Sequence, residues 1–270
     1  MSARQLKLTL FGTGSSGGVP RIGNIWGVCD PEEPRNYRTR CGAMFELIDE
    51  DMSDATRVLI DTSADLRVQL LAAKVSRVDA VFFTHDHADQ TGGIDDIRAL
   101  AYLQRRRIPA HMDKETAATL TVRAKYCFEG ELGYPPIMDL APYLKPFERR
   151  EIVGVSGLLE FLPIRQSHGA ISSLGFRVGP IAYCNDVSDL SAEALEALRG
   201  VDIFVVDALR PEPHPSHAHL DRALAWAREI AATKTVLTNL HIDMDYQRLR
   251  RELPEGVEPG YDGMILTAPV

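Results

Sequence analysis

The chain has 270 residues, of which 45% are hydrophobic and 25% are charged, a composition typical of a globular protein with a sizeable core. Its formal net charge of −8 at pH 7 argues against proteins that bind long nucleic acids by neutralising many phosphates, because that mode of binding needs a basic face. No stretch has the roughly eighteen uncharged apolar residues of a membrane span, so we expect a cytoplasmic protein with no membrane partner.

The first part of the chain is dominated by strand patterns. Short β-rich runs bounded by glycine, proline and charged residues predict strands at 6–11, 43–48, 57–62, 78–84 and 108–112. Apolar residues at helical spacing predict helices at 64–74, 94–107 and 114–128. The proline-rich segment 133–147 is predicted to be a long ordered loop over the surface.

The second part repeats this style. Strands are predicted at 158–164, 173–178, 180–186, 201–209, 235–241 and 263–268, and helices at 191–200 and 221–233. Two β-rich halves, each followed by helices, indicate an α/β (α+β) fold of two stacked sheets with helices outside. Since no linker divides the halves, we predict a single domain over 1–270.

The stretch THDHADQ, residues 84–90, stands where a predicted buried strand ends and a helix begins. Imidazole and carboxylate groups bind zinc, manganese or iron at neutral pH. Residues one apart project to the same side of an extended loop, so His85 and His87 can bind one ion together, while Asp89 can reach a second. Asp86 is expected to orient a ligand or a water from outside the coordination shell.

Three further candidates each follow a predicted strand: His168, Asp186 and His241. Strands of one sheet that end on the same edge would bring these scattered residues together. Tyr183 and Asn185 flank Asp186, and each has two interpretations, contact with substrate or simple packing.

These residues carry a resemblance to a known family. The chain is similar to the metallo-β-lactamase superfamily, whose motif HxHxDH is followed by a distant histidine, aspartate and histidine. The matching positions are His85, His87, Asp89, His168, Asp186 and His241. The resemblance implies a four-layer αββα sandwich and two divalent ions, zinc or manganese. It implies a first site of His85, His87, His168 and Asp186, and a second of Asp89, His241 and the bridging Asp186.

Gln90 occupies the position of the final histidine in that motif. An amide oxygen is a weaker zinc ligand than imidazole, so we expect the second site to be the weaker one, with Gln90 as a metal ligand or as a neighbour of the ligands. Asp61, at the end of the predicted strand 57–62, resembles the family aspartate that supports the metal histidines from behind.

Three longer stretches, LFGTGSSGGVP, LIDTSADLR and THDHADQTGGIDDIRAL, resemble the branch containing the cyclic-phosphate phosphodiesterase of phosphonate degradation. Related enzymes place a histidine before a helix, where it donates a proton to the leaving oxygen. His217 is the nearest match here, with His214 and His219 as alternatives. The resemblance implies hydrolysis of a small nucleotide-like or cyclic sugar phosphate through a metal-bridged hydroxide, with Asp89 and His217 as catalytic residues and His217 in contact with substrate.

Two other functions remain open at this point. The same metal cluster serves hydrolases of other esters, such as lactones, thioesters and β-lactams, because the fold does not choose the bond. A ligand-binding protein that keeps the fold without turnover is the competing class, and Gln90 is the reason to consider it. The sequence leaves the oligomeric state open, with a homodimer among the alternatives.

Overall fold

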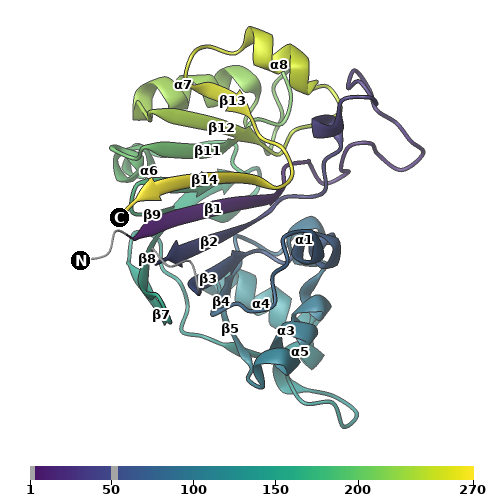
Figure 1. The fold of residues 1–270 in the computed structure, drawn as a ribbon, viewed down its shortest axis with the longest axis vertical. Coiled ribbons are helices and arrows are strands. Elements are labelled where there is room, and N and C mark those ends of the chain that lie inside the picture. Colours follow the sequence, from purple (N-terminus) through teal and green to yellow (C-terminus); the bar gives the residue numbers. More distant parts are fainter. Residues whose placement is uncertain (1–3, 50–53) are drawn as a thin grey trace.

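The computed structural model describes residues 4–49 and 54–270 (Figure 1). Two seven-stranded sheets pack face to face, and helices cover their outer faces. The α/β class and the four-layer αββα sandwich expected from the sequence are therefore confirmed.

The first sheet has the order β14-β1-β2-β3-β4-β5-β6. Its strands are β1 (Gln5–Gly12), β2 (Gly42–Ile48), β3 (Ala55–Ile60), β4 (Ala80–Phe82), β5 (Ile108–His111), β6 (Met138–Leu140) and β14 (Met264–Pro269). The pairs from β14 to β3 are antiparallel and the pairs from β3 to β6 are parallel. Because parallel strands end at the same edge, the residues that follow β3 and β4 meet there.

The second sheet has the order β13-β12-β11-β10-β9-β8-β7. Its strands are β7 (Arg150–Gly154), β8 (Gly157–His168), β9 (Ile171–Val178), β10 (Ile181–Cys184), β11 (Ile203–Asp207), β12 (Lys234–Thr238) and β13 (Val257–Pro259). Strands β10 to β13 run parallel, so the residues after β10, β11 and β12 also gather at one edge.

Helices flank the two sheets. Those near the first sheet are α1 (Leu66–Ala72), α2 (Ala88–Thr91), α3 (Ile97–Gln104), α4 (Lys114–Arg123) and α5 (Lys125–Glu129); those near the second are α6 (Ala192–Leu198), α7 (Leu220–Ile230) and α8 (Tyr246–Glu252). Several begin at a side-chain cap, as when the Asp113 carboxylate accepts from the Thr116 amide at 2.7 Å. In the described ranges, no helix is long and apolar enough to cross a membrane.

Several predicted elements differ in detail, and β7, β13 and α8 are not predicted by the sequence patterns. The helix expected over 94–107 begins as a 3-10 turn (Ile94–Asp96) and ends at Gln104, because Arg105 takes a left-handed conformation with φ of 52°. The helix expected over 114–128 divides at Ala124 into α4 and α5. The loop expected over 133–147 contains the short edge strand β6.

Aromatic side chains fill the space between the sheets. The ring centroid of Phe161 lies 4.5 Å from that of Phe82, 5.5 Å from that of Phe45 and 6.2 Å from that of Phe176. Phe161 and Phe176 belong to the second sheet, while Phe45 and Phe82 belong to the first. Since all four rings are fully buried, their contacts stabilise the position of one sheet against the other.

Phe161→Ala should lower the free energy of unfolding by about 3–5 kcal/mol, because it removes a buried ring and leaves a cavity between the sheets. Urea denaturation followed by circular dichroism measures this loss. Val122→Ala, at a side chain 73% exposed on α4, is the control and should change stability by less than about 0.5 kcal/mol. A Phe161→Ala protein as stable as this control would contradict the importance of the aromatic contacts.

Candidate metal centre

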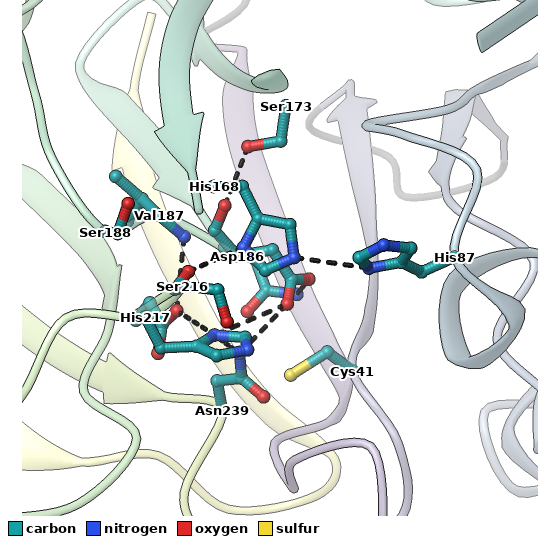
Figure 2. Close-up of polar contacts among 12 residues, drawn as sticks. Cys41, His87, His168, Ser173, Asp186, Val187, Ser188, Ser216, His217 and Asn239 are labelled. Atoms are coloured by element: carbon teal, nitrogen blue, oxygen red, sulfur yellow. Dashed lines mark hydrogen bonds and ion pairs between the residues drawn. The ribbon is translucent and has the colours of Figure 1, made fainter. Parts of the chain in front are cut away.

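The ends of strands from both sheets meet at one edge of the molecule. Figure 2 shows His87, His168, Asp186 and His217 turned toward one another. His87 lies between β4 and α2, His168 ends β8, Asp186 follows β10, and His217 precedes α7. Of the three scattered candidates predicted from the sequence, His168 and Asp186 are therefore brought together here, beside His87 and His217.

The His85 ring is held by Thr84 and Asp61. Asp61 accepts hydrogen bonds from the Thr84 amide at 2.8 Å and from the Thr84 hydroxyl at 2.9 Å. Thr84 Oγ1 has already donated its hydrogen to Asp61, so at 2.9 Å it accepts from Nδ1 of His85. That tautomer leaves a lone pair on Nε2, which is buried and has no hydrogen-bond partner within the described residues. Burial also lowers the pKa of His85, which favours the neutral form that binds metal.

His168 presents its ring in the same way. Its Nδ1 donates to the carbonyl of Ser216 at 2.6 Å, so Nε2 carries the lone pair. That Nε2 lies 3.2 Å from Nδ1 of His87, and the ligand atoms of His85, His87 and His168 all lie within 4.8 Å of one another. Ligand nitrogens on one tetrahedral zinc stand about 3.3 Å apart, so the separation of His87 and His168 fits such an ion. Burial lowers the pKa of His168 to about 4, so this ring too is neutral.

Asp186 adds a buried carboxylate beside the three histidines. Its Oδ2 accepts from Asn185 Nδ2 at 2.7 Å and from Gln90 Nε2 at 2.9 Å, and its Oδ1 lies 3.2 Å from Asn239 Nδ2. Burial, and after it the charge of Asp89, raise the pKa of Asp186. Negative charge concentrated beside neutral imidazoles is the environment in which a divalent cation is stabilised. The residues present therefore fit a metal ion at this first site.

His217 is oriented by a carboxylate that the sequence interpretation missed. Its Nδ1 lies 2.7 Å from Oδ2 of Asp207, which is fully buried at the end of β11. Burial opposes a charged ring, but the charge and hydrogen bond of Asp207, with the charge of Asp186, outweigh it and raise the pKa of His217 to about 9. A signal was present, because Asp207 ends an apolar strand, as Asp61 and Asp186 follow theirs.

The family model for the beta-lactamase superfamily domain matches residues 56–242, more than half of the chain. The chain belongs to the metallo-β-lactamase superfamily. A solved diphosphatase of the PhnP family is 32% identical to it, with a TM-score of 0.84 and with 98% of each chain covered. The resemblance to the phosphodiesterase branch of the superfamily is thereby confirmed.

Two other relatives extend this picture. Zn(2+)-bound PqqB from Methylobacterium extorquens has the same fold, with 16% identity, a TM-score of 0.72, and coverage of 96% of this chain and 99% of that one. An octanoyltransferase of Porphyromonas gingivalis (strain ATCC BAA-308 / W83) is 31% identical over 265 residues, which are 96% of this chain and 51% of the relative. The chain thus spans about half the length of this curated relative.

The second metal site implied by the superfamily motif does not form in the same way. Within residues 4–49 and 54–270, neither Asp89 nor His241 belongs to a group of three clustered ligand atoms. Gln90 Nε2 donates to Asp186 and lies 3.2 Å from Asp89 Oδ2, so an amide stands between the two carboxylates. His241 has Asp243 Oδ2 at 2.6 Å from its Nδ1, and its Nε2 contacts the guanidinium of Arg21.

Asp86 and Tyr183 both make structural contacts. The Asp86 carboxylate pairs with Arg123 of α4, which also donates to the Thr91 hydroxyl at 2.6 Å, so Asp86 fastens the motif to that helix. Its expected role in orienting a ligand or a water stays a prediction. Tyr183 is fully buried in the core between the sheets, and this burial removes it from contact with a substrate. Asn185 is also buried, and its amide holds Asp186.

The three neighbouring histidines are distinguished by their contacts. His214 Nδ1 accepts from the Ser216 amide at 3.3 Å, within its own loop. His219 stands at the N-cap of α7 without a side-chain capping bond. Only His217 of these three has a fully buried carboxylate behind its ring, which makes it the best placed of them for proton transfer.

His168→Ala should weaken binding of the first ion by at least about tenfold with the fold retained, because it removes a direct ligand and little core volume. Elemental analysis after dialysis and circular dichroism measure the two properties. His219→Ala should keep the wild-type metal content. A His168→Ala protein that holds as much metal as this control would show the ligand assignment to be wrong.

Gln90→His should tighten binding of a second ion by about ten to a hundred fold, because an imidazole lone pair would replace an amide N–H facing two carboxylates. Calorimetric titration with zinc should show the first site unchanged. Gln90→Leu removes the amide without adding a ligand and should gain no second ion. Identical titrations of wild type and Gln90→His would mean that this position has no bearing on metal binding.

Proposed function

We propose that this protein is a metal-dependent phosphodiester hydrolase that acts on a small nucleotide-like or cyclic sugar phosphate. The observation that carries the proposal is the pairing of a three-histidine metal group with a carboxylate-oriented histidine. The ring centroids of His168 and His217 lie 4.8 Å apart, so proton transfer and metal chemistry share one site. The similarity to a PhnP-family diphosphatase over 98% of the chain supports the same class of bond.

His85, His87 and His168, with Asp186, are the residues proposed to hold the ion. A zinc or manganese ion there would supply Lewis-acid polarisation of a phosphoryl oxygen and a water of lowered pKa. Thr84 and the Ser216 carbonyl fix the tautomers of His85 and His168, so these rings bind without reorganising. Asn185 and Gln90 hold the Asp186 carboxylate in place.

His217 is proposed as the proton donor to the leaving oxygen. Asp207 accepts from Nδ1 and stabilises the protonated ring, which leaves the Nε2 proton for transfer. An alkoxide leaving group needs such a donor because its conjugate acid has a high pKa. Asp89 is proposed to act through its negative charge, which raises the pKa of Asp186. The Gln90 amide lies between the two carboxylates.

The proposed substrate is small for an electrostatic reason. The net charge of −8 disfavours a long nucleic acid, whose many phosphates would be repelled. A cytoplasmic location stays a prediction of the sequence, and a homodimer stays one of the open alternatives. The alternatives at this site are another ester hydrolase and a non-catalytic binding protein.

Parallel assays decide among these classes. Protein loaded with zinc or manganese should hydrolyse bis-(p-nitrophenyl) phosphate, and the same preparation should be tested on a lactone and a thioester. Turnover of the carbon esters alone would overturn the phosphodiester proposal. No turnover by protein with a filled first site would favour the binding protein.

His217→Ala should retain the wild-type metal content yet lose about a hundred to ten thousand fold in rate on a diester with an alkoxide leaving group. The loss should be much smaller on a p-nitrophenyl ester, because that leaving group needs little protonation. Steady-state kinetics on both substrates measure the contrast. Asp207→Asn should show the same contrast in weaker form, and equal losses on both substrates would point to binding instead of proton donation.

A further inference from the structure

Arg21 stands beside a residue that the superfamily motif assigns to the second metal ion. Its guanidinium Nη2 contacts Nε2 of His241, and Oδ2 of Asp243 lies 2.6 Å from the other ring nitrogen, Nδ1. Arg21 therefore stands at the Nε2 atom of His241. Arg21 is 220 residues away from His241 in the sequence, so the histidine motif does not predict this contact.

The position of Arg21 is built into the glycine-rich loop after β1. A Cβ placed on Gly17 would lie 3.2 Å from Nε and 3.3 Å from Cγ of Arg21, so the absence of a side chain at Gly17 leaves room for the arginine. The Arg21 amide and carbonyl pair with the carbonyl and amide of Ile25 at 3.0 and 3.2 Å. These contacts aim the guanidinium toward His241.

The Gln90 side chain lies at the position where the superfamily motif implies a second metal ion. Its Nε2 lies 2.9 Å from Oδ2 of Asp186 and 3.2 Å from Oδ2 of Asp89, and the side chain is fully buried. An amide N–H group between two carboxylate oxygens supplies partial positive charge where a metal ion would supply a full one. Gln90 therefore directs an N–H donor, and not its amide oxygen, at the two carboxylates that would otherwise share an ion.

The guanidinium of Arg21 is available for an anion. Within the described part of the chain, no carboxylate lies close enough to Arg21 to form an ion pair. Among the described residues, its side-chain partner is the His241 ring, which carries no formal negative charge to neutralise the guanidinium. Arginine presents several N–H donors in a planar fork that matches phosphoryl oxygens.

We propose that this chain works with one resident metal ion, and that Arg21 binds an anionic phosphoryl oxygen of the substrate in place of the second ion. The inference rests on the proposed phosphodiester function. It assigns a substrate-binding role to Arg21. Gln90 and Arg21 together would exclude the second ion and so distinguish this chain from a two-ion enzyme.

Binding of inorganic phosphate to the metal-loaded protein tests the role of Arg21 without turnover. Arg21→Met should weaken phosphate binding by about tenfold or more in calorimetry, with the metal content unchanged at one equivalent. Arg21→Lys keeps the positive charge but loses the planar guanidinium. Its affinity for phosphate should therefore fall between those of wild type and Arg21→Met. Arg105→Met, at an exposed arginine at the end of α3, should bind phosphate like wild type.

Metal stoichiometry tests the other half of the inference. Wild type should hold one equivalent of zinc after dialysis, and the double variant Gln90→His, Arg21→Met should approach two. A wild type with two equivalents, a double variant with one, or phosphate binding by Arg21→Met and Arg21→Lys equal to wild type would overturn the inference. Failure of the proposed function would be seen separately, as wild type that turns over no phosphodiester.

Discussion

The site depends on a backbone reversal where strands end. Asp61 after β3, Asp186 after β10 and Asn239 after β12 all take left-handed conformations, with φ of 62°, 50° and 61°. Asp and Asn tolerate this region better than most residues because their short polar side chains hydrogen-bond locally. Figure 2 shows the side chains of Asp186 and Asn239 close to His217, and the Asp61 carboxylate accepts two hydrogen bonds from Thr84.

That arrangement gathers negative charge that must be compensated. Asp61, Asp186 and Asp207 are all nearly or fully buried, and burial raises the pKa of each. Each carboxylate accepts hydrogen bonds from specific donors. Thr84 donates to Asp61, Asn185 and Gln90 donate to Asp186, and His217 donates to Asp207. The same carboxylates that orient the histidines also create the field in which a cation is stable, so the proposed metal binding and the proposed proton donation share one electrostatic origin.

Gln90 joins the ligand cluster to the scaffold. Its side chain bonds Asp186 across the two sheets, while its carbonyl accepts from the Thr62 amide at 2.8 Å. Gly93 allows this close approach, because a Cβ there would meet the Ser63 carbonyl at 2.1 Å. At this junction Gln90 directs an amide N–H at Asp186, where the motif histidine would offer an imidazole.

The sequence alone determined most of the strands and helices, the two stacked sheets with helices outside, and the candidates His85, His87 and His168, because apolar periodicity and strand-end residues act over short distances along the chain. It did not predict the edge strands β6, β7 and β13 or the helix α8. Tertiary structure alone decided that Asp207 supports His217, that Asp86 pairs with Arg123, that Tyr183 is sealed in the core, and that Arg21 meets His241. Each of these is a side-chain contact or burial set by how the sheets, helices and loops pack together. Packing geometry, and not local pattern, selects among the many charged groups that could pair.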